Sequence, residues 1–287
     1  MTKAIRTPAL VVRAFNVEVA RIQDQTTDPQ TAAFRLQFWQ DALTIIYKKD
    51  QSQQNIPANP IAQELYKVCS CYSLPRRHLE RLVTSRSGLI KARHFRSLED
   101  LERYAEDAVS PIYYLLLNVA GIKDIHADHA ASHLGKAQGI ANILRSIYVS
   151  NHHKMMSLPM DILMKYGISQ EEVLRGIDSE NMRNVTFEIA SQANSHLEKV
   201  KYNINILKNQ KVIRMAYLLK SAIYIFFQAR KIKVPKIVNQ IFLPATGVDA
   251  YLKKLQKANF NIFEKSLQKQ NTTLPFSLYY RRLTNKY

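Results

Sequence analysis

Hydrophobic residues recur at helical spacing through most of the chain. The segment 34–47 predicts a helix whose apolar face comprises Leu36, Trp39, Leu43 and Ile46. A second strong pattern runs from residue 98 to residue 119, and Pro111 should split or kink the helix there. We find no segment with the alternating apolar and polar positions of a strand. The pattern therefore predicts an all-α protein.

Further helices are expected at 61–71, 125–148, 161–165, 182–200 and 251–263. Two start signals support these boundaries. Ser97 with Asp100, and Ser169 with Glu172, have the spacing of capping boxes. The helix 125–148 carries a stripe of mostly small residues, so neighbouring helices should pack closely against it: Ala127, Ala130, Leu134, Ala137, Ala141, Leu144 and Tyr148.

The segment 201–229 differs from the rest of the chain, because it contains no Asp, Glu, Gly or Pro. Residues 212–228 could form a basic and apolar helix that lies on a membrane surface. Alternatively, 201–229 is an insertion that is not part of the core fold.

Composition fits one large helical domain. The chain has 287 residues, 46% of them apolar and 22% charged, with only 7 glycines and 10 prolines to break helices. No apolar stretch is long enough to span a bilayer. Cys69 and Cys71 are separated by one residue, which is a poor disulfide spacing and fits a reducing compartment.

The formal net charge is +18, which favours anionic partners such as nucleic acid, an acidic membrane face or acidic proteins. It is also compatible with a basic surface that has no dedicated ligand. The basic stretch between residues 76 and 96 has few aromatic side chains on which bases could stack. We interpret it as a solvated face and expect no nucleic-acid partner; its cations are Arg76, Arg77, Arg81, Arg86, Lys91, Arg93 and Arg96.

Two clusters could hold a metal ion, but each has a simpler interpretation. The acids on the helix after residue 97 are better explained as a solvated helix face that includes Arg103; they are Glu99, Asp100, Glu102, Glu106 and Asp107. His129 and His133 have the spacing of a zinc pair and share a helix with His126. No third ligand is evident, so packed or capping histidines are expected instead.

Three stretches, in this order and spacing, resemble the squalene and phytoene synthase family. They are 14–18 (AFNVE) followed by 35–43 (RLQFWQDAL), 134–145 (LGKAQGIANILR), and 158–161 (LPMD) followed by 166–169 (YGIS). The resemblance implies an isoprenoid synthase-like helical bundle around a central cavity. It also implies a single domain over 1–287 that lacks the first helix of the family.

Enzymes of that family hold magnesium and a prenyl diphosphate between two aspartate-rich motifs. In the first motif, this chain has Ala20, Arg21 and Asp24, so the resemblance implies that one acid remains. In the second motif, Gln138, Asn142 and Arg145 remain, whereas Ser146 and Ser150 stand where acids are expected. The resemblance therefore implies vestigial positions around the cavity, no metal, no cofactor and no catalysis. A residual prenyltransferase, or a protein that binds a prenyl diphosphate or another lipid, is the alternative.

Other stretches are similar to a non-catalytic branch of the family that serves the assembly of mitochondrial respiratory complex I. They are 126–133 (HADHAASH), 135–139 (GKAQG) and 249–267. This resemblance implies a protein that binds complex I subunits or assembly intermediates early in assembly. It further implies peripheral association with the matrix side of the inner membrane. The first 17 residues carry three cations and no acid, which faintly indicates a presequence.

Overall fold

The computed structural model describes residues 3–26, 28–48, 55–150, 157–220, 234–269 and 271–284, without the side chains of 3–4, 148–150, 208–220 and 234–236. Its first seven helices are α1 (Lys3–Gln25), α2 (Pro29–Ile46), α3 (Pro60–Tyr72), α4 (Arg76–Ala92), α5 (Leu98–Ala108), α6 (Ser110–Val119) and α7 (Ile125–Ser150). They are followed by α8 (Met160–Lys165), α9 (Gln170–Arg175), α10 (Glu180–Lys220), α11 (Val234–Phe242), α12 (Pro244–Lys257), the 3₁₀ helix η4 (Lys265–Gln268) and α13 (Leu274–Thr284).

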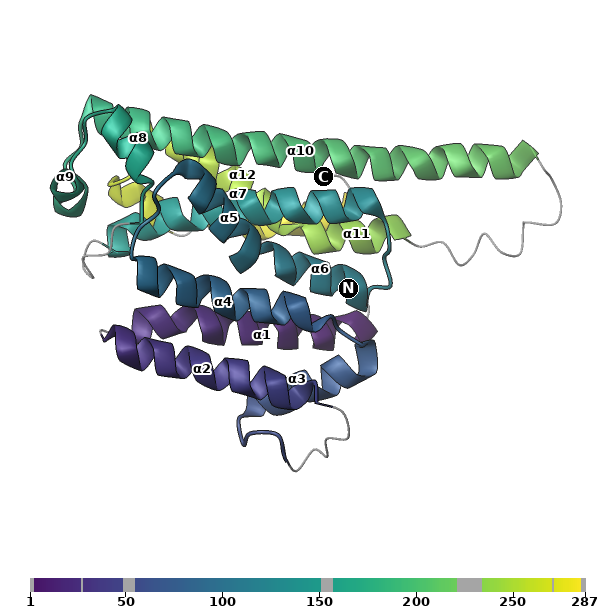
Figure 1. The fold of residues 1–287 in the computed structure, drawn as a ribbon. Coiled ribbons are helices and arrows are strands. Elements are labelled where there is room, and N and C mark those ends of the chain that lie inside the picture. The colour runs from purple at the N-terminus through teal and green to yellow at the C-terminus, as the bar shows by residue number, and fades with distance from the viewer. Residues whose placement is uncertain are drawn as a thin grey trace.

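The all-α prediction is confirmed for the residues that the structure describes, which contain helices and a single isolated bridge between Phe95 and Pro159. Figure 1 shows the helices in successive layers, with α10 along one side, then α7, then α5 and α6, then α4 and α1, and finally α2 and α3. In this described part, no helix combines the length and the apolar character needed to cross a bilayer.

Helix α7 lies at the centre of the bundle and packs most extensively against α10. Its small residues are buried, as the apolar stripe predicts; among them are Ala127, Ala130, Leu134, Ala137 and Ala141. Two glycines bring its backbone against α5 and α6. A Cβ at Gly135 would lie 2.6 Å from Ser110 Cα, and a Cβ at Gly139 would lie 2.8 Å from Ala105 Cα. Only glycine allows so close an approach.

The predicted helix starts are largely confirmed. Ser169 and Glu172 form both halves of a capping box at the start of α9. This helix ends at Gly176, which has the left-handed conformation with φ of 69°. At α5, the Ser97 hydroxyl accepts a hydrogen bond from Asp100 N at 3.2 Å. Asp100 itself lies 3.6 Å from Arg103, so the reciprocal half of this box is replaced by an ion pair.

Pro111 occupies the first turn of α6, where its missing N–H costs nothing, and the chain breaks at Val109 as the sequence predicts. The expected helix at 251–263 is wrong in its boundaries. Helix α12 spans Pro244–Lys257, and the chain then turns because Asn259 and Phe260 adopt positive φ values of 49° and 57°. The apolar residues beyond the turn still pack inward, and Ile262 is buried.

The predicted end of a helix at residue 200 is also wrong, because α10 continues to Lys220. Its early turns beyond residue 200 join the core: Ile204 is buried, and Asn203 lies 3.3 Å from His126 Nδ1. The backbone of 212–220 is helical as part of α10, whereas 221–228 lie outside the described residues. Whether 201–229 is an insertion, and whether it contacts a membrane, remain predictions.

Candidate functional site

The vestigial positions named from the sequence lie on two helices, α1 and α7, which both end at the left of the bundle in Figure 1. On α1, Ala20 is half-buried, whereas Arg21 and Asp24 are exposed. Asp24 is near enough to the α5 residue Tyr104 to influence the pKa of its phenol. The first group of positions therefore presents one carboxylate and one guanidinium to solvent.

On α7, Gln138, Asn142 and Ser146 are half-buried and Arg145 is exposed. Each of these four side chains forms a hydrogen bond within the protein. Gln138 Oε1 accepts a short hydrogen bond from the Tyr113 hydroxyl, and Arg145 donates to Asn142 Oδ1 at 3.4 Å. The Ser146 hydroxyl donates to the carbonyl of Ile143 at 2.8 Å. Ser150 ends α7, and its side chain is outside the described residues.

Two tyrosines that the sequence analysis did not select belong to this region. Tyr113 on α6 is buried between α7, where it bonds Gln138, and α11, where its ring stacks on Phe242 with centroids 6.1 Å apart. Tyr251 on α12 has a buried hydroxyl for which the described residues provide no hydrogen-bond partner. Burial raises the pKa of the Tyr251 phenol, and the charge of Arg145 opposes that rise. Both tyrosines occur on apolar helix faces, so the sequence gives no signal beyond the presence of their hydroxyl groups.

A buried guanidinium lies between α1 and α4. Arg86 is only 7% exposed, and it donates to Asn16 Oδ1 at 2.8 Å and to the carbonyls of Leu82 and Ala108. Burial lowers the pKa of Arg86, and the nearby Tyr104 opposes the effect. The prediction that the basic stretch is entirely solvated is therefore wrong at this residue, because polar oxygens of α1, α4 and α5 satisfy its donors.

The side chains at the vestigial positions do not suit the binding of a magnesium ion with a diphosphate. Magnesium is usually bound through carboxylates together with phosphate oxygens, and the only carboxylate among the seven described vestigial side chains is Asp24. Throughout the described residues, no group of three His, Cys, Asp or Glu side chains is arranged to hold a metal. Amide, hydroxyl and guanidinium groups can instead hydrogen-bond to a neutral or anionic partner.

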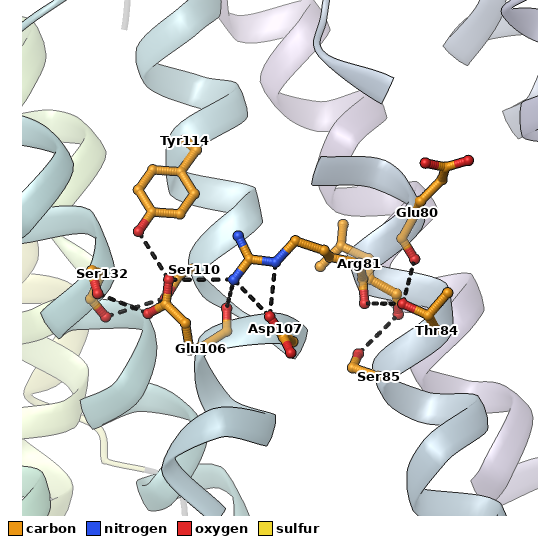
Figure 2. A network of polar contacts seen from close by, with 10 residues as sticks. Glu80, Arg81, Thr84, Ser85, Glu106, Asp107, Ser110, Tyr114 and Ser132 are labelled. Atoms are coloured by element: carbon orange, nitrogen blue, oxygen red, sulfur yellow. Dashed lines mark hydrogen bonds and ion pairs between the residues drawn. The ribbon is translucent and has the colours of Figure 1, made fainter. Parts of the chain in front are cut away.

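A network of polar contacts centres on Glu106 (Figure 2). Its carboxylate accepts hydrogen bonds from Ser110 and Ser132, both at 2.8 Å, and from Tyr114 at 2.9 Å. Arg81 lies 3.4 Å from the same carboxylate and 2.6 Å from Asp107. The network joins α4, α5, α6 and α7 and fixes the position of α7.

The pKa of Glu106 reflects this arrangement. Burial alone would raise the pKa of the carboxyl group, but the hydrogen bonds from Ser110, Ser132 and Tyr114, with the charge of Arg81, lower it overall. Glu102 is also half-buried and accepts a short hydrogen bond from Gln192 on α10. At Glu102 and Glu106, the prediction that the acids of α5 form a solvated face is wrong. That prediction holds at Glu99, whose carboxylate is exposed and lies 3.5 Å from Arg103.

The histidines of α7 do not form a zinc pair. His129 is exposed, whereas His133 turns toward α10, where its Nδ1 lies 3.0 Å from His196 Nδ1. Glu102 Oε2 lies 3.3 Å from His196 Nε2 without forming a hydrogen bond. Burial, together with the positive charges of neighbouring groups, lowers the pKa of His133 to about 4 and also lowers that of His196. His126 and His133 pack against α10, as the simpler interpretation predicts, whereas His129 does not.

A cavity of about 780 Å³ opens where α4 and α7 begin and α6 ends, at the opposite end of α7 from the vestigial positions. Its lining includes apolar, basic and acidic side chains: Leu117, Ile122, Ile125, Arg77, Arg81, Lys123, Asp124 and Asp128. His78 also lines the cavity; it is only 8% exposed, and no described residue forms a hydrogen bond with its Nδ1.

Proteins of known name are similar to this chain over almost its whole length. A Rattus norvegicus protein named NADH dehydrogenase (ubiquinone) complex I, assembly factor 6 is 37% identical over 279 residues, which are 97% of this chain and 74% of that protein. A Drosophila melanogaster homolog of the same name is 35% identical, with 100% and 78% covered. A Dictyostelium discoideum homolog is 30% identical, with 96% and 68% covered.

Two solved structures show the same fold. The squalene synthase HpnC from Alicyclobacillus acidocaldarius superposes with a TM-score of 0.70 at 15% identity, over 90% of this chain and 85% of that structure. A dehydrosqualene synthase solved with a ligand gives 0.71 at 15% identity, over 99% and 88%. The model of the squalene/phytoene synthase family matches residues 1–277. With its helical architecture and this near-complete match, the chain belongs to the squalene/phytoene synthase family.

Proposed function

We propose that this chain is a non-catalytic assembly factor for mitochondrial respiratory complex I, the NADH:ubiquinone oxidoreductase. The observation that carries the proposal is the similarity to proteins named for complex I assembly, at 30% to 37% identity over at least 96% of the chain. The proposed partners are complex I subunits or assembly intermediates, and the proposed stage is early assembly.

The composition of the vestigial positions supports the absence of catalysis. Ionisation of a prenyl diphosphate needs strong neutralisation of the leaving group, which magnesium supplies in related enzymes. Here Arg21 and Arg145 are cations, Asp24 is exposed, and Asn142 and Ser146 are neutral. A site of this kind lacks the carboxylates that would hold the metal ions in place.

Depletion of the protein in its own organism tests the assembly role. Solubilised mitochondria would be separated on a blue native gel and stained for NADH dehydrogenase activity. We expect selective loss of complex I and of its later intermediates, with the other respiratory complexes intact. Normal complex I would contradict the role, and accumulation of a nearly complete intermediate would contradict the early stage.

Rescue of the depleted cells with variants tests the absence of catalysis. Asp24→Asn removes the only described carboxylate among the vestigial positions, and its exposure makes a folding defect unexpected. We expect this variant to restore complex I as well as the unaltered chain does. Failure of Asp24→Asn at normal protein levels, or release of pyrophosphate from a prenyl diphosphate by the purified protein with magnesium, would contradict a non-catalytic function.

The proposed location is the matrix side of the inner membrane, with peripheral association. The basic composition supports this location, because a net charge of +18 favours contact with an anionic lipid surface. Alkaline carbonate should release the protein from mitochondrial membranes, and protease should reach it only after the inner membrane is opened. Resistance to carbonate, or digestion in intact mitoplasts, would contradict the location.

The cavity near His78 favours a second candidate function, the binding of an anionic lipid such as a prenyl diphosphate without turnover. Its volume suits a small ligand, and its lining combines apolar side chains with three cations and two acids. The cations are Arg77, Arg81 and Lys123, and they outnumber the acids Asp124 and Asp128. Native mass spectrometry of the purified protein should detect a bound lipid that Arg77→Glu loses and Arg93→Glu, at another exposed site, retains. A protein that is empty in repeated preparations would contradict this function.

A further inference from the structure

Helix α13 (Leu274–Thr284) presents an unusual outer face. It packs on α12, yet none of its residues is buried. The half-buried residues Leu274, Ser277, Leu278 and Arg281 recur at helical spacing and mark the face toward the protein. The opposite face carries large apolar side chains at the same spacing: Phe276, Tyr279, Tyr280 and Leu283, which are 77%, 61%, 61% and 65% exposed.

Exposure of such an apolar stripe to water is energetically unfavourable. Isolated exposed apolar residues are normal on proteins, but a continuous stripe marks a contact surface. Here the four side chains occupy positions i, i+3, i+4 and i+7, so they form one continuous strip along the helix. The strip therefore needs a partner that covers apolar and aromatic side chains together.

Charge around the helix indicates the nature of that partner. The segment 253–284 contains seven Lys or Arg residues and one acid, Glu264. Helix α13 has no acid, and Arg281 and Arg282 lie in its last turn. On the adjoining elements, Lys257 and Lys265 are exposed. This surface is complementary to a partner with dense negative charge.

We propose that α13 is an interfacial helix that lies in the surface of a membrane containing anionic lipids. Phe and Leu side chains enter the boundary of the acyl chains, tyrosines favour the headgroup level, and the cations pair with anionic headgroups. This inference deepens the proposed function, because it assigns the peripheral association to one surface. It assigns a membrane contact to α13, in addition to the one predicted from the sequence for 212–228.

Vesicle sedimentation with the full-length protein tests the proposal with purified components. Binding to vesicles of equimolar phosphatidylcholine and phosphatidylglycerol should exceed binding to pure phosphatidylcholine. Replacement of Phe276, Tyr280 and Leu283 by Ser should reduce the partition coefficient about tenfold or more, because three apolar anchors are lost. The exposure of these side chains should leave helical content and thermal unfolding unchanged.

A matched control uses Ser at Leu10, Phe34 and Phe38, which are 62%, 69% and 40% exposed on α1 and α2. This control should bind vesicles as the unaltered protein does. If the α13 variant binds anionic vesicles normally, or if both variants lose binding equally, the proposal is overturned.

An equivalent comparison tests the role of charge. One variant replaces Lys257, Lys265 and Arg282 by Gln, and its control replaces Arg35, Lys91 and Arg93, which are also exposed, by Gln. The first variant should bind anionic vesicles more weakly than the control.

Depth of insertion gives an independent readout. The chain has one tryptophan, Trp39, which is buried. In Phe276→Trp, new fluorescence should be quenched by brominated lipids, whereas in Phe34→Trp it should not. Lack of quenching at position 276 would overturn the proposal. Because vesicle binding requires no complex I, its failure is distinct from failure of the assembly role, which rescue in cells measures.

Discussion

His133 Nδ1 and His196 Nδ1 lie 3.0 Å apart where α7 packs against α10. A hydrogen bond between two imidazole nitrogens requires a proton on one and a lone pair on the other. If both rings were protonated, two donors and two positive charges would face each other. The contact therefore favours the state in which at least one of the two histidines is neutral.

This pair should make stability depend on pH. The folded-state pKa of His133 is about 4, below the ordinary value of about 6.5, so the unfolded chain binds more protons between these values. The contribution of His133 to the free energy of unfolding is therefore fully present above about pH 6.5, and it is lost as the pH falls toward about 4. Denaturant titrations should show His133→Asn losing less stability than the unaltered chain from about pH 7 to about pH 5. The exposed His129→Asn is the control, and equal losses in all three proteins would refute the assignment.

The glycines of α7 should be intolerant of even one added methyl group. Ala at 135 or 139 would place Cβ against the backbone of Ser110 or Ala105, and we expect a loss of about 1–3 kcal/mol in unfolding free energy. Gly88 and Gly247 are helical glycines with open space around them, so Ala there should be neutral or should stabilise by about 0.5–1 kcal/mol. Thermal and denaturant unfolding would measure all four, and similar values would argue against close packing.

Glu106→Gln should destabilise the junction of four helices. The amide keeps one acceptor oxygen but loses the charge that holds three hydroxyl donors and Arg81, so a cost of about 2 kcal/mol is expected. Glu99→Gln is the matched control, because its side chain is 83% exposed and its ion pair should contribute less than about 0.5 kcal/mol. Denaturant unfolding of both variants at neutral pH compares them directly.

Arg86 and Asn16 should be energetically coupled. Arg86→Met removes a buried guanidinium and leaves Asn16 Oδ1 without its 2.8 Å donor, at an expected cost of about 2 kcal/mol. Asn16→Leu alone leaves the guanidinium without that acceptor. The double variant should therefore lose less stability than the two single variants together. Strict additivity in a double-mutant cycle would show that the contact contributes little.

Helix positions follow from the sequence wherever local signals are strong. The break at Pro111 and the capping box at Ser169 depend on backbone chemistry within a few residues, and both occur as predicted. The ends of α10 and α12 were missed. The sequence around residue 200 contains no helix breaker, and two residues other than glycine adopt positive φ after Lys257.

The environments of charged residues were harder to predict. Arg86 and Glu106 belong to sequence runs rich in charge, and only the packing of other helices brings Asn16, Ser132 and Tyr114 to them. The vestigial positions were assigned to two motifs through family resemblance. The structure places them on α1 and α7, because each motif lies toward the end of a long helix.

The close contact of α7 with α5 and α6 depends on Gly135 and Gly139, where no side chain takes part. The vestigial positions on the same helix are half-buried or exposed, and none of their described side chains belongs to the buried core. Framework and chemistry can therefore be inherited separately in this fold. Substitution of the polar positions would leave the helical framework intact. Few mutations are therefore needed to convert an enzyme with this fold into a protein that only binds a partner.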